Sequence, residues 1–126
     1  MAEFAYELKI PKKRIGVLIG KNGKVKRSIE KRTKTKIKID SKEGDVFVKG
    51  GDALTLYASR NIIKAIGRGF NPKIAKLLIK QDYCFELLNI KDFVGENHIR
   101  RVKGRIIGSD GKTRRLIEEL AECYVS

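Results

Sequence analysis

The sequence lacks most of the side chains on which catalysis and metal binding depend. Its 126 residues include no tryptophan, a single histidine (His98) and two cysteines, Cys84 and Cys123, with no CxxC pair. No apolar run approaches the roughly 18 residues of a membrane span, and the N-terminus has no signal-peptide pattern. We therefore expect a cytoplasmic protein without metal, cofactor or enzymatic activity. Its cysteines are expected to be reduced and to lie buried as small apolar residues.

Acidic residues are also scarce, and the excess of positive charge is concentrated in two segments. Lysine and arginine number 29 against 15 aspartates and glutamates, which gives a formal net charge of +14. Residues 9–38 hold 13 basic residues and one acid, and residues 100–115 hold seven basic residues and one acid. Two such concentrations on a short chain favour a polyanion as the partner.

The two basic segments repeat each other. A shift of 88 positions places residues 16–30 on residues 104–118, and eight of the fifteen positions are then identical. The identical positions include three glycines, a lysine and an arginine. Each copy carries a G-x-x-G segment, at 20–23 and at 108–111, followed at once by a lysine. We interpret the repeat as a duplicated structural unit.

Apolar periodicity around the first copy predicts short strands and helices in a definite order. The expected elements are strands at 5–10, 35–40 and 45–49 and helices at 12–19, 24–32 and 53–66. Asp52 is the expected N-cap of the last helix, and Gly67 is expected to end it. The unit therefore has the order strand, helix, helix, strand, strand, helix.

The second half of the chain predicts the same order but stops before the unit is complete. Asn71-Pro72 is a typical helix start. The expected elements are helices at 72–81, 96–107 and 112–121, a strand at 83–90 and the beginning of a strand at 123–125. About 28 positions of the second unit are missing by the same offset, so we expect a fragment of a longer protein.

Each copy has a G-x-x-G loop between two short helices, preceded by Gly-x-Leu-Ile or Gly-x-Ile-Ile, and in the first copy an alternating basic strand follows. This arrangement resembles the KH domain family. The order of elements is similar to the type I form of that family. The resemblance implies an α+β fold class with tandem type I KH domains, the first at residues 1–68 and the second at residues 69–126. The second domain would lack about its last third.

The longer stretch around the second loop is similar to the archaeal, Dim-two-like form of the Partner-of-Nob ribosome-assembly family. The similarity includes residues 96–102, which lead into the loop helix, and residues 121–125, which leave it. It implies binding to single-stranded rRNA near the 3′ end of the small-subunit RNA, within the pre-small ribosomal subunit. It also implies a maturation endonuclease and the alpha subunit of initiation factor two as protein partners.

The loop residues themselves favour phosphate binding. Glycines at both ends of a four-residue loop permit a tight turn and close approach of a ligand, and helices beginning at Lys24 and Lys112 direct unpaired N–H groups toward it. Ile37 and Ile39 offer an apolar floor, and a cleft of this kind suits about four unstacked nucleotides. Lys21-Asn22 adds positive charge to the first loop, whereas Ser109-Asp110 adds negative charge to the second, so both modules remain candidates.

The residues themselves and the family resemblance together give two sets of RNA-binding positions. The first module is expected to use Gly16, Ile19, Gly20, Lys21, Asn22, Gly23, Lys24, Lys26, Arg27, Ile37, Lys38 and Ile39. The second is expected to use Gly104, Ile107, Gly108, Ser109, Asp110, Gly111, Lys112, Arg114 and Arg115. Among these, the resemblance alone assigns Gly16, Ile19, Lys26 and Lys38 to the first groove and Gly104, Ile107 and Arg114 to the second.

Other functions remain open alongside an RNA-binding assembly factor. The chain could be the RNA-delivering KH module of an exosome or ribonuclease complex, or one copy could have become a protein-docking surface. Gly111-Lys112-Thr113 resembles the end of a P-loop, but Ile106 stands where that motif needs glycine. The aromatic residues are scattered along the chain, and we expect most of them in the core, with little role in base stacking.

Overall fold

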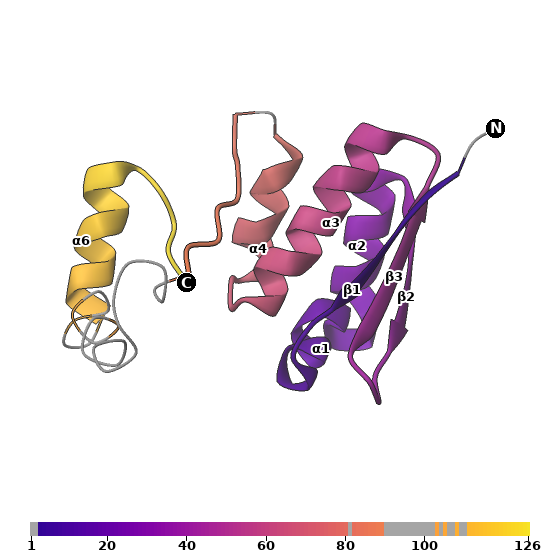
Figure 1. Cartoon of the computed structure of the whole chain (residues 1–126), viewed down its shortest axis with the longest axis horizontal. Helices are drawn as coiled ribbons and strands as arrows, with labels where there is room; N and C mark the ends of the chain where they lie inside the picture. The colour runs from indigo at the N-terminus through magenta and orange to yellow at the C-terminus, as the bar shows by residue number, and fades with distance from the viewer. Residues whose placement is uncertain (1–2, 81, 90–102, 104, 106–107, 109–110) are drawn as a thin grey trace. The chain divides into compact units, whose positions relative to one another are not determined.

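The computed structural model describes residues 3–80, 82–89, 103, 105, 108 and 111–126. Contacts divide the chain into two units, Met1–Phe85 and Glu86–Ser126. The first unit is a three-stranded sheet with helices packed against it, and the second contains helix α6 (Lys112–Ala121), as Figure 1 shows.

The first unit folds in the order that the sequence predicts. Its elements are β1 (Phe4–Lys9), α1 (Lys12–Ile19), η1 (Lys21–Gly23), α2 (Lys24–Thr33), β2 (Thr35–Asp40), β3 (Asp45–Gly50), α3 (Ala53–Gly67), α4 (Pro72–Ala75) and η2 (Lys76–Ile79). From β1 to α3, the expected bounds differ from the observed ones by at most one residue. The two short 3-10 segments, η1 and η2, lie in the loop after α1 and after α4.

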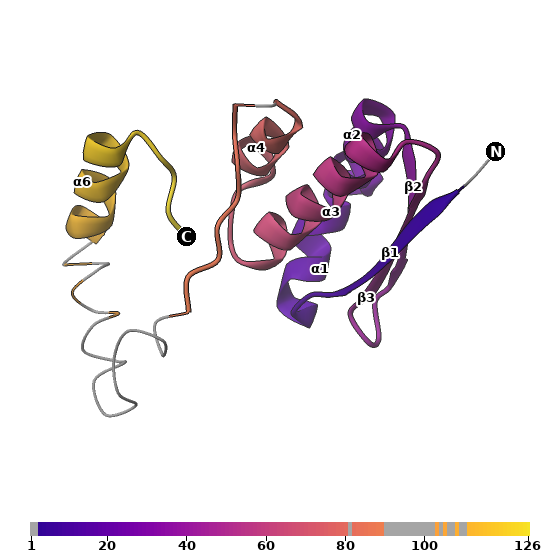
Figure 2. The same cartoon turned by 45° about the horizontal axis from the view of Figure 1, so that its top comes forward.

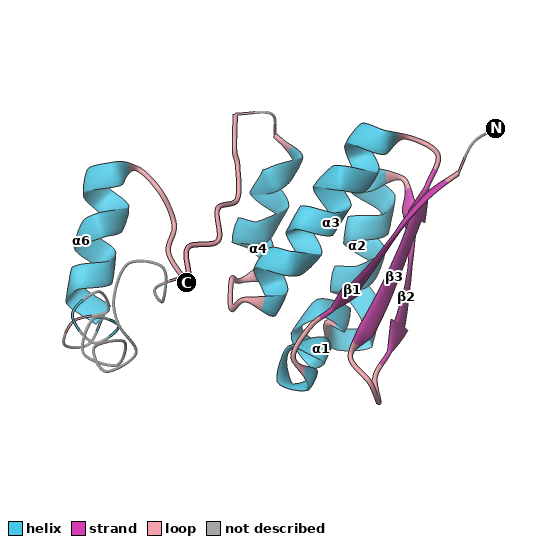
Figure 3. Cartoon of the chain, viewed as in Figure 1, coloured by secondary structure: helices cyan, strands magenta, loops and turns pink. Residues whose placement is uncertain are grey.

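The sheet has the strand order β1–β3–β2, with both neighbouring pairs antiparallel. Along β3, Val46 and Val48 are fully buried, whereas Phe47 between them is exposed. Successive side chains of a strand point to opposite faces, so the valines mark the face that the helices cover. Figure 3 shows the helices of this unit on one side of the sheet, with the other side open.

The core lies between the covered face of the sheet and helices α1, α2 and α3. Leu18, Ile29, Leu56 and Ile62 are fully buried there. In the part of the chain that the structure describes, every buried apolar side chain lies between Ile10 and Ala75. The first unit therefore carries the whole of the described core.

Helix α3 is fixed at both ends. At its N-terminus the Asp52 side chain accepts a hydrogen bond from Leu54 N at 3.0 Å, as its predicted role as N-cap requires. At its C-terminus the Arg14 guanidinium donates to Ile66 O at 2.8 Å and to Phe70 O at 3.0 Å. A cation at this end also complements the helix dipole.

The segment after α3 begins as predicted but is shorter as an α-helix than expected. Asn71 caps it by accepting a hydrogen bond from Lys73 N at 2.9 Å. The α-helix then ends at Ala75 and continues as the 3-10 turn η2, so the expected helix at 72–81 is wrong in its second half. Figure 2 shows α4 beside α3.

The first unit extends beyond the expected domain boundary at residue 68. Phe70, Leu78, Ile79 and Phe85 all pack against its core, and the Phe70 and Phe85 rings meet edge to face at 6.1 Å. Burial, and then repulsion from Arg32, lowers the pKa of a lysine in this segment, Lys76. The residues between 69 and 85 therefore belong to the first unit by their contacts.

Helix α6 of the second unit has the predicted bounds, but the strands expected around it are wrong. Residues 83–89 and 123–126 are irregular. A strand needs a neighbouring strand for its hydrogen bonds, and the described residues offer none to either segment. The expected helix at 96–107 falls almost entirely outside the described residues.

Two expectations about burial are also wrong. Cys84 and Cys123 are both exposed, because the segments that contain them are irregular rather than buried strands. Most of the described aromatic residues are exposed rather than in the core; the exposed ones are Phe4, Tyr6, Phe47, Tyr57, Tyr83 and Tyr124. The ninth aromatic residue, Phe93, lies outside the described residues. Because these rings are exposed, they are accessible for stacking on bases, contrary to the expectation from the sequence.

Candidate nucleic-acid interface

The first G-x-x-G segment forms a tight turn between α1 and α2. Gly20 and Gly23 both adopt positive φ angles, 75° and 73°, and Asn22 between them has φ 55°. Gly23 N donates to Gly20 O at 3.2 Å, and the Arg27 guanidinium donates to Asn22 O at 2.6 Å. One hydrogen bond within the turn and one from Arg27 of α2 therefore stabilise it, and the Lys21 and Asn22 side chains remain exposed.

The second G-x-x-G segment has the same backbone conformation where the structure describes it. Gly108 has φ 70°, and Gly111 has φ 72° and ψ 17°, against φ 73° and ψ 16° at Gly23. Both following helices span ten residues and end on a left-handed residue, Lys34 in the first and Glu122 in the second. The duplication predicted from the sequence is therefore present in the backbone.

Positive side chains line the helix that follows each loop. In the first copy Lys24, Arg27 and Lys31 are exposed at i, i+3 and i+7 spacing, which places them on one face of α2. Lys26 is half-buried. In the second copy the exposed basic residues are Lys112, Arg114 and Arg115. The predicted site residues Gly104, Ile107, Ser109 and Asp110 lie outside the described residues.

The two helices differ in how their charge is balanced. Arg114 in α6 forms an ion pair with Glu118 at 3.8 Å. In α2 the corresponding glutamate, Glu30, instead accepts a hydrogen bond from Ile37 N at 2.9 Å. The first helix thus keeps more of its positive charge for a ligand than the second does.

The Glu30 contact also places α2 beside the edge of the sheet. Ile37 N is directed away from β3, so the open edge of β2 faces α2. Helix α2, which begins at the first loop, therefore lies next to the edge of β2. Gly16 on α1 is exposed, and a methyl group added there would meet nothing within 4 Å.

The three predicted β2 residues differ in exposure. Ile39 is half-buried, as Ile19 on α1 is, and both contribute apolar surface. Ile37 is only 3% exposed, so its side chain belongs to the core and cannot serve as floor for a base. Lys38 is exposed on the open face of the sheet, because it alternates with the isoleucines.

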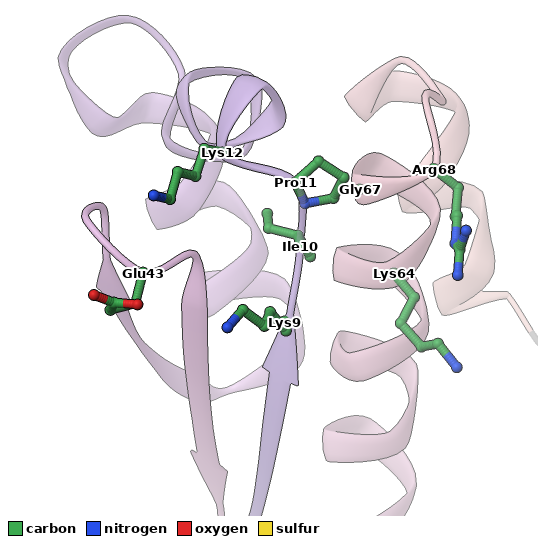
Figure 4. A pocket seen from close by; sticks show the side chains of 8 residues that line it. All are labelled: Lys9, Ile10, Pro11, Lys12, Glu43, Lys64, Gly67 and Arg68. Carbon is green, nitrogen blue, oxygen red and sulfur yellow. The ribbon is translucent and has the colours of Figure 1, made fainter.

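A pocket of about 470 Å³ includes none of the loop residues 20–23, and no pattern in the sequence pointed to it. It is lined by Lys9, Ile10, Pro11, Lys12, Glu43, Lys64, Gly67 and Arg68. In Figure 4, Lys9 and Lys12 extend toward the side of Glu43, whereas Lys64 and Arg68 extend from α3 in another direction. The four cations therefore do not converge on one point.

The described residues contain no group of histidine, cysteine and carboxylate side chains that could hold a metal ion. Within the same residues, no helix is both long enough and apolar enough to span a membrane. Beside the first loop, the two left-handed glycines, the exposed cations of α2 and the half-buried Ile19 occur in consecutive segments of the chain.

Two family models match the chain, one on each half. The KH domain model matches residues 5–68, and a model described as eukaryotic type KH-domain (KH-domain type I) matches residues 84–126. The first match covers the sheet and helices α1 to α3, and the second covers α6 with its loop.

Two curated relatives are similar to the chain in sequence. A KH domain-containing protein of Methanocaldococcus jannaschii is 49% identical over 124 residues, which cover 94% of this chain and 54% of that protein. The RNA-binding protein pno-1 of Caenorhabditis elegans is 30% identical over 78 residues, which cover 59% of this chain and 28% of that protein. The chain thus spans about half the length of the archaeal relative, and less of the nematode one.

Two solved structures from Pyrococcus horikoshii are similar to the chain in fold and sequence. Dim2p matches with a TM-score of 0.91 and 46% identity, covering 98% of this chain and 75% of that one. The aDim2p of a complex with a/eIF2alpha and rRNA matches with a TM-score of 0.91 and 45% identity, covering 98% and 71%. The predicted α+β fold class and family are confirmed, and the chain belongs to the archaeal Dim2/Pno1-like family of KH-domain proteins.

Proposed function

We propose that this chain binds single-stranded RNA without catalysing a reaction, and that the groove between the first G-x-x-G loop and the edge of β2 holds it. The observation that carries the proposal is the repeated turn. Gly23 and Gly111 have the same left-handed conformation, and each directly precedes a helix with exposed basic residues, α2 and α6. Backbone N–H groups at a helix N-terminus bind phosphate, and neighbouring lysines and arginines add charge.

In the proposed groove, one group of residues contacts phosphates and another contacts bases. Lys21, Lys24 and Arg27 contact phosphates, and these contacts supply most of the affinity. Ile19 and Ile39 provide the apolar surface against which unstacked bases lie, and exposed Gly16 lets the strand approach α1 closely. A G-x-x-G groove of this kind holds about four nucleotides.

The second loop is proposed to bind RNA in the same manner, with the second unit, Glu86–Ser126, contributing a second KH module to the protein. Lys112 and Arg115 would contact phosphates there, while Arg114 shares its charge with Glu118. We expect the first loop to contribute more to affinity, since its helix has no such ion pair.

Two relatives support a proposal for the biological role. One relative is an RNA-binding protein by name, and another occurs in a complex with a/eIF2alpha and rRNA. We propose that this chain acts in assembly of the small ribosomal subunit and binds its rRNA near the 3′ end. Proposed protein partners are the alpha subunit of initiation factor two and a maturation endonuclease.

The test is a fluorescence-anisotropy titration of a short single strand that matches the 3′ end of small-subunit rRNA, with a duplex and a scrambled strand beside it. In Lys21→Asp/Asn22→Asp we expect binding of the single strand to weaken by about tenfold or more. The matched control Lys73→Asp/Lys80→Gln changes the net charge equally at exposed positions away from the loop and should weaken binding much less. The Ser109→Asp variant tests the second loop.

Salt dependence supplies a second readout. Five phosphate contacts, at about 0.7 each for a single strand, give a log–log slope near −3.5. The Lys21→Asp/Asn22→Asp variant should lose about one or two phosphate contacts, so the magnitude of its slope should fall by about 0.7 to 1.4. Equal binding of duplex and single strand, with the same loss in the loop variant and the control, would refute the groove and leave only general attraction to positive charge.

A further inference from the structure

The open face of the sheet carries one exposed aromatic ring in its centre. Phe47 is 39% exposed and lies on the middle strand, β3. Its direct neighbours across the sheet are Lys38 on β2 and Glu7 on β1. Directly opposed residues point to the same face, so all three side chains share the face that the helices leave open (Figure 1).

Three lysines lie near the ring on this face, Lys36 and Lys38 on β2 and Lys49 on β3. The next row along the sheet places Lys36 beside Lys49, and all three lysines of this area are exposed. In the described part of the chain, no carboxylate is within ion-pair distance of Lys36, Lys38 or Lys49. Phosphate groups near the ring would therefore meet available ammonium groups.

Acidic side chains border the ring on the other sides. Glu7 stands beyond Phe47 on β1, and the row at the hairpin end of the sheet holds Asp40, Asp45 and Lys9. Like charge repels phosphate, so Glu7 and the net negative hairpin row are less favourable to a nucleic-acid strand than the lysines are. Approach over the part of β2 that carries Lys36 and Lys38 therefore meets positive charge.

The groove proposed above lies at that same edge. The open edge of β2 faces α2 through the Glu30 to Ile37 hydrogen bond. Neighbouring strands lie about 4.8 Å apart, so Phe47 is one strand away from the edge at which the groove ends. A nucleic-acid strand that leaves the groove over β2 passes Lys38 first and then reaches the ring.

We infer that Phe47 and the lysines Lys36, Lys38 and Lys49 form a second RNA-binding surface on the open face of the sheet. This sheet-face site takes a nucleotide that follows those held in the groove, stacks its base on the Phe47 ring and binds its phosphates through the lysines. The inference rests on the proposed function, because the groove delivers the strand. Stacking on an aromatic side chain accepts any base, so the site adds affinity and length rather than sequence preference.

The first experiment compares strands of different length on the full chain by anisotropy. The wild type should bind an eight-nucleotide strand about tenfold more tightly than its four-nucleotide core, and Phe47→Leu should lose most of that gain. Phe47→Leu keeps an apolar side chain but removes the ring. Phe47→Tyr should keep the gain, and binding of the four-nucleotide strand should be unchanged in both variants. Tyr57→Leu is the control, since Tyr57 is also exposed but lies on α3.

The absence of tryptophan allows a direct observation of the stacked base. Phe47→Trp introduces the single tryptophan of the chain, and a base stacked on it should quench its fluorescence with the eight-nucleotide strand but not with the four-nucleotide strand. Tyr57→Trp, read in the same way, should respond to neither. A melting curve of each variant confirms that the sheet is intact.

Three outcomes would overturn the inference. The first is a wild type that gains nothing beyond four nucleotides. The second is a length gain that Phe47→Leu leaves intact, which would assign the gain to the second loop. The third is tryptophan fluorescence in the Phe47→Trp variant that does not respond to the longer strand. Failure of the four-nucleotide strand to bind at all would refute the groove itself and, with it, the path on which the sheet-face site depends.

Discussion

The two glycines of the first loop are needed for different physical reasons. A methyl group on Gly20 would lie 2.8 Å from Val25 Cβ and 2.9 Å from Val25 N, whereas one on Gly23 would meet nothing within 4 Å. Both residues have positive φ, which strains any residue with a Cβ. The second loop shows the same difference. A methyl group on Gly108 would clash with Thr113, whereas one on Gly111 would meet only the side chains of Arg114 and Arg115, at 3.7 Å.

This difference predicts unequal effects of substitution. Gly20→Ala adds a steric clash to the backbone strain and should lower the free energy of unfolding by about 3 kcal/mol. Gly23→Ala carries the strain alone, so about 1 kcal/mol is expected, and Gly23→Asn should lose less because asparagine tolerates the left-handed region. Urea unfolding followed by circular dichroism measures all three. Equal losses at the two glycines would contradict the steric account.

At the scale of elements, α3 holds the first unit together. It contacts all three strands, α1, α2 and the segment that follows it. Its C-terminus is also the point at which the chain turns into α4, and Arg14 of α1 binds a carbonyl on each side of that turn, Ile66 O and Phe70 O. One side chain thus connects α1, α3 and the start of the following segment.

Removing this side chain should destabilise the unit. Hydrogen bonds from a charged donor contribute about 1.5–3 kcal/mol each, and these two are only partly buried, so we expect Arg14→Ala to lower the free energy of unfolding by about 2 kcal/mol. Lys13→Ala, on the exposed side of the same helix, is the control and should change little. Chemical denaturation provides the measurement. A loss as small as that of the control would show that the two hydrogen bonds contribute nothing net.

At the scale of the molecule, the described core lies in one unit, whereas the two basic loops are divided between both units. The buried apolar side chains of the described residues all lie in the first unit, whereas each unit has a G-x-x-G loop. In α6, Leu116, Ile117 and Leu120 are exposed. The counterpart of Ile117 in the first copy, Ile29, is fully buried. Each unit therefore has a G-x-x-G loop, but among the described residues only the first unit buries apolar side chains.

This distribution predicts that residues 1–85 fold without the rest of the chain. All the described core residues, and the side chains of Phe70, Leu78 and Ile79 that pack on them, are present in that segment. A polypeptide of residues 1–85 should unfold cooperatively, with a midpoint within a few degrees of that of the main transition of the full chain. Differential scanning calorimetry makes the comparison. A non-cooperative transition would show that the first unit depends on the second.

The repeat, the order of elements in the first unit and the position of both loops could all be predicted from the sequence. The repeat is visible as identity between two segments. The elements and loops depend on local properties: the spacing of apolar residues, the conformational freedom of glycine, and capping by Asp52 and Asn71, which hydrogen bonds between near neighbours confirm. These local features can be predicted because each depends on residues only a few positions apart.

Which side chains are available to a ligand was settled by tertiary packing. Ile37 and Ile39 alternate identically in the sequence, yet only Ile37 is enclosed, and Ile39 stays half-buried although its neighbour on β3, Val46, is fully buried. Phe47 is out of phase with two buried valines, which was a signal for exposure, but its lysine neighbour Lys38 comes from another strand. Burial and neighbourhood depend on residues far apart in the chain, and only the folded arrangement of strands and helices brings these together.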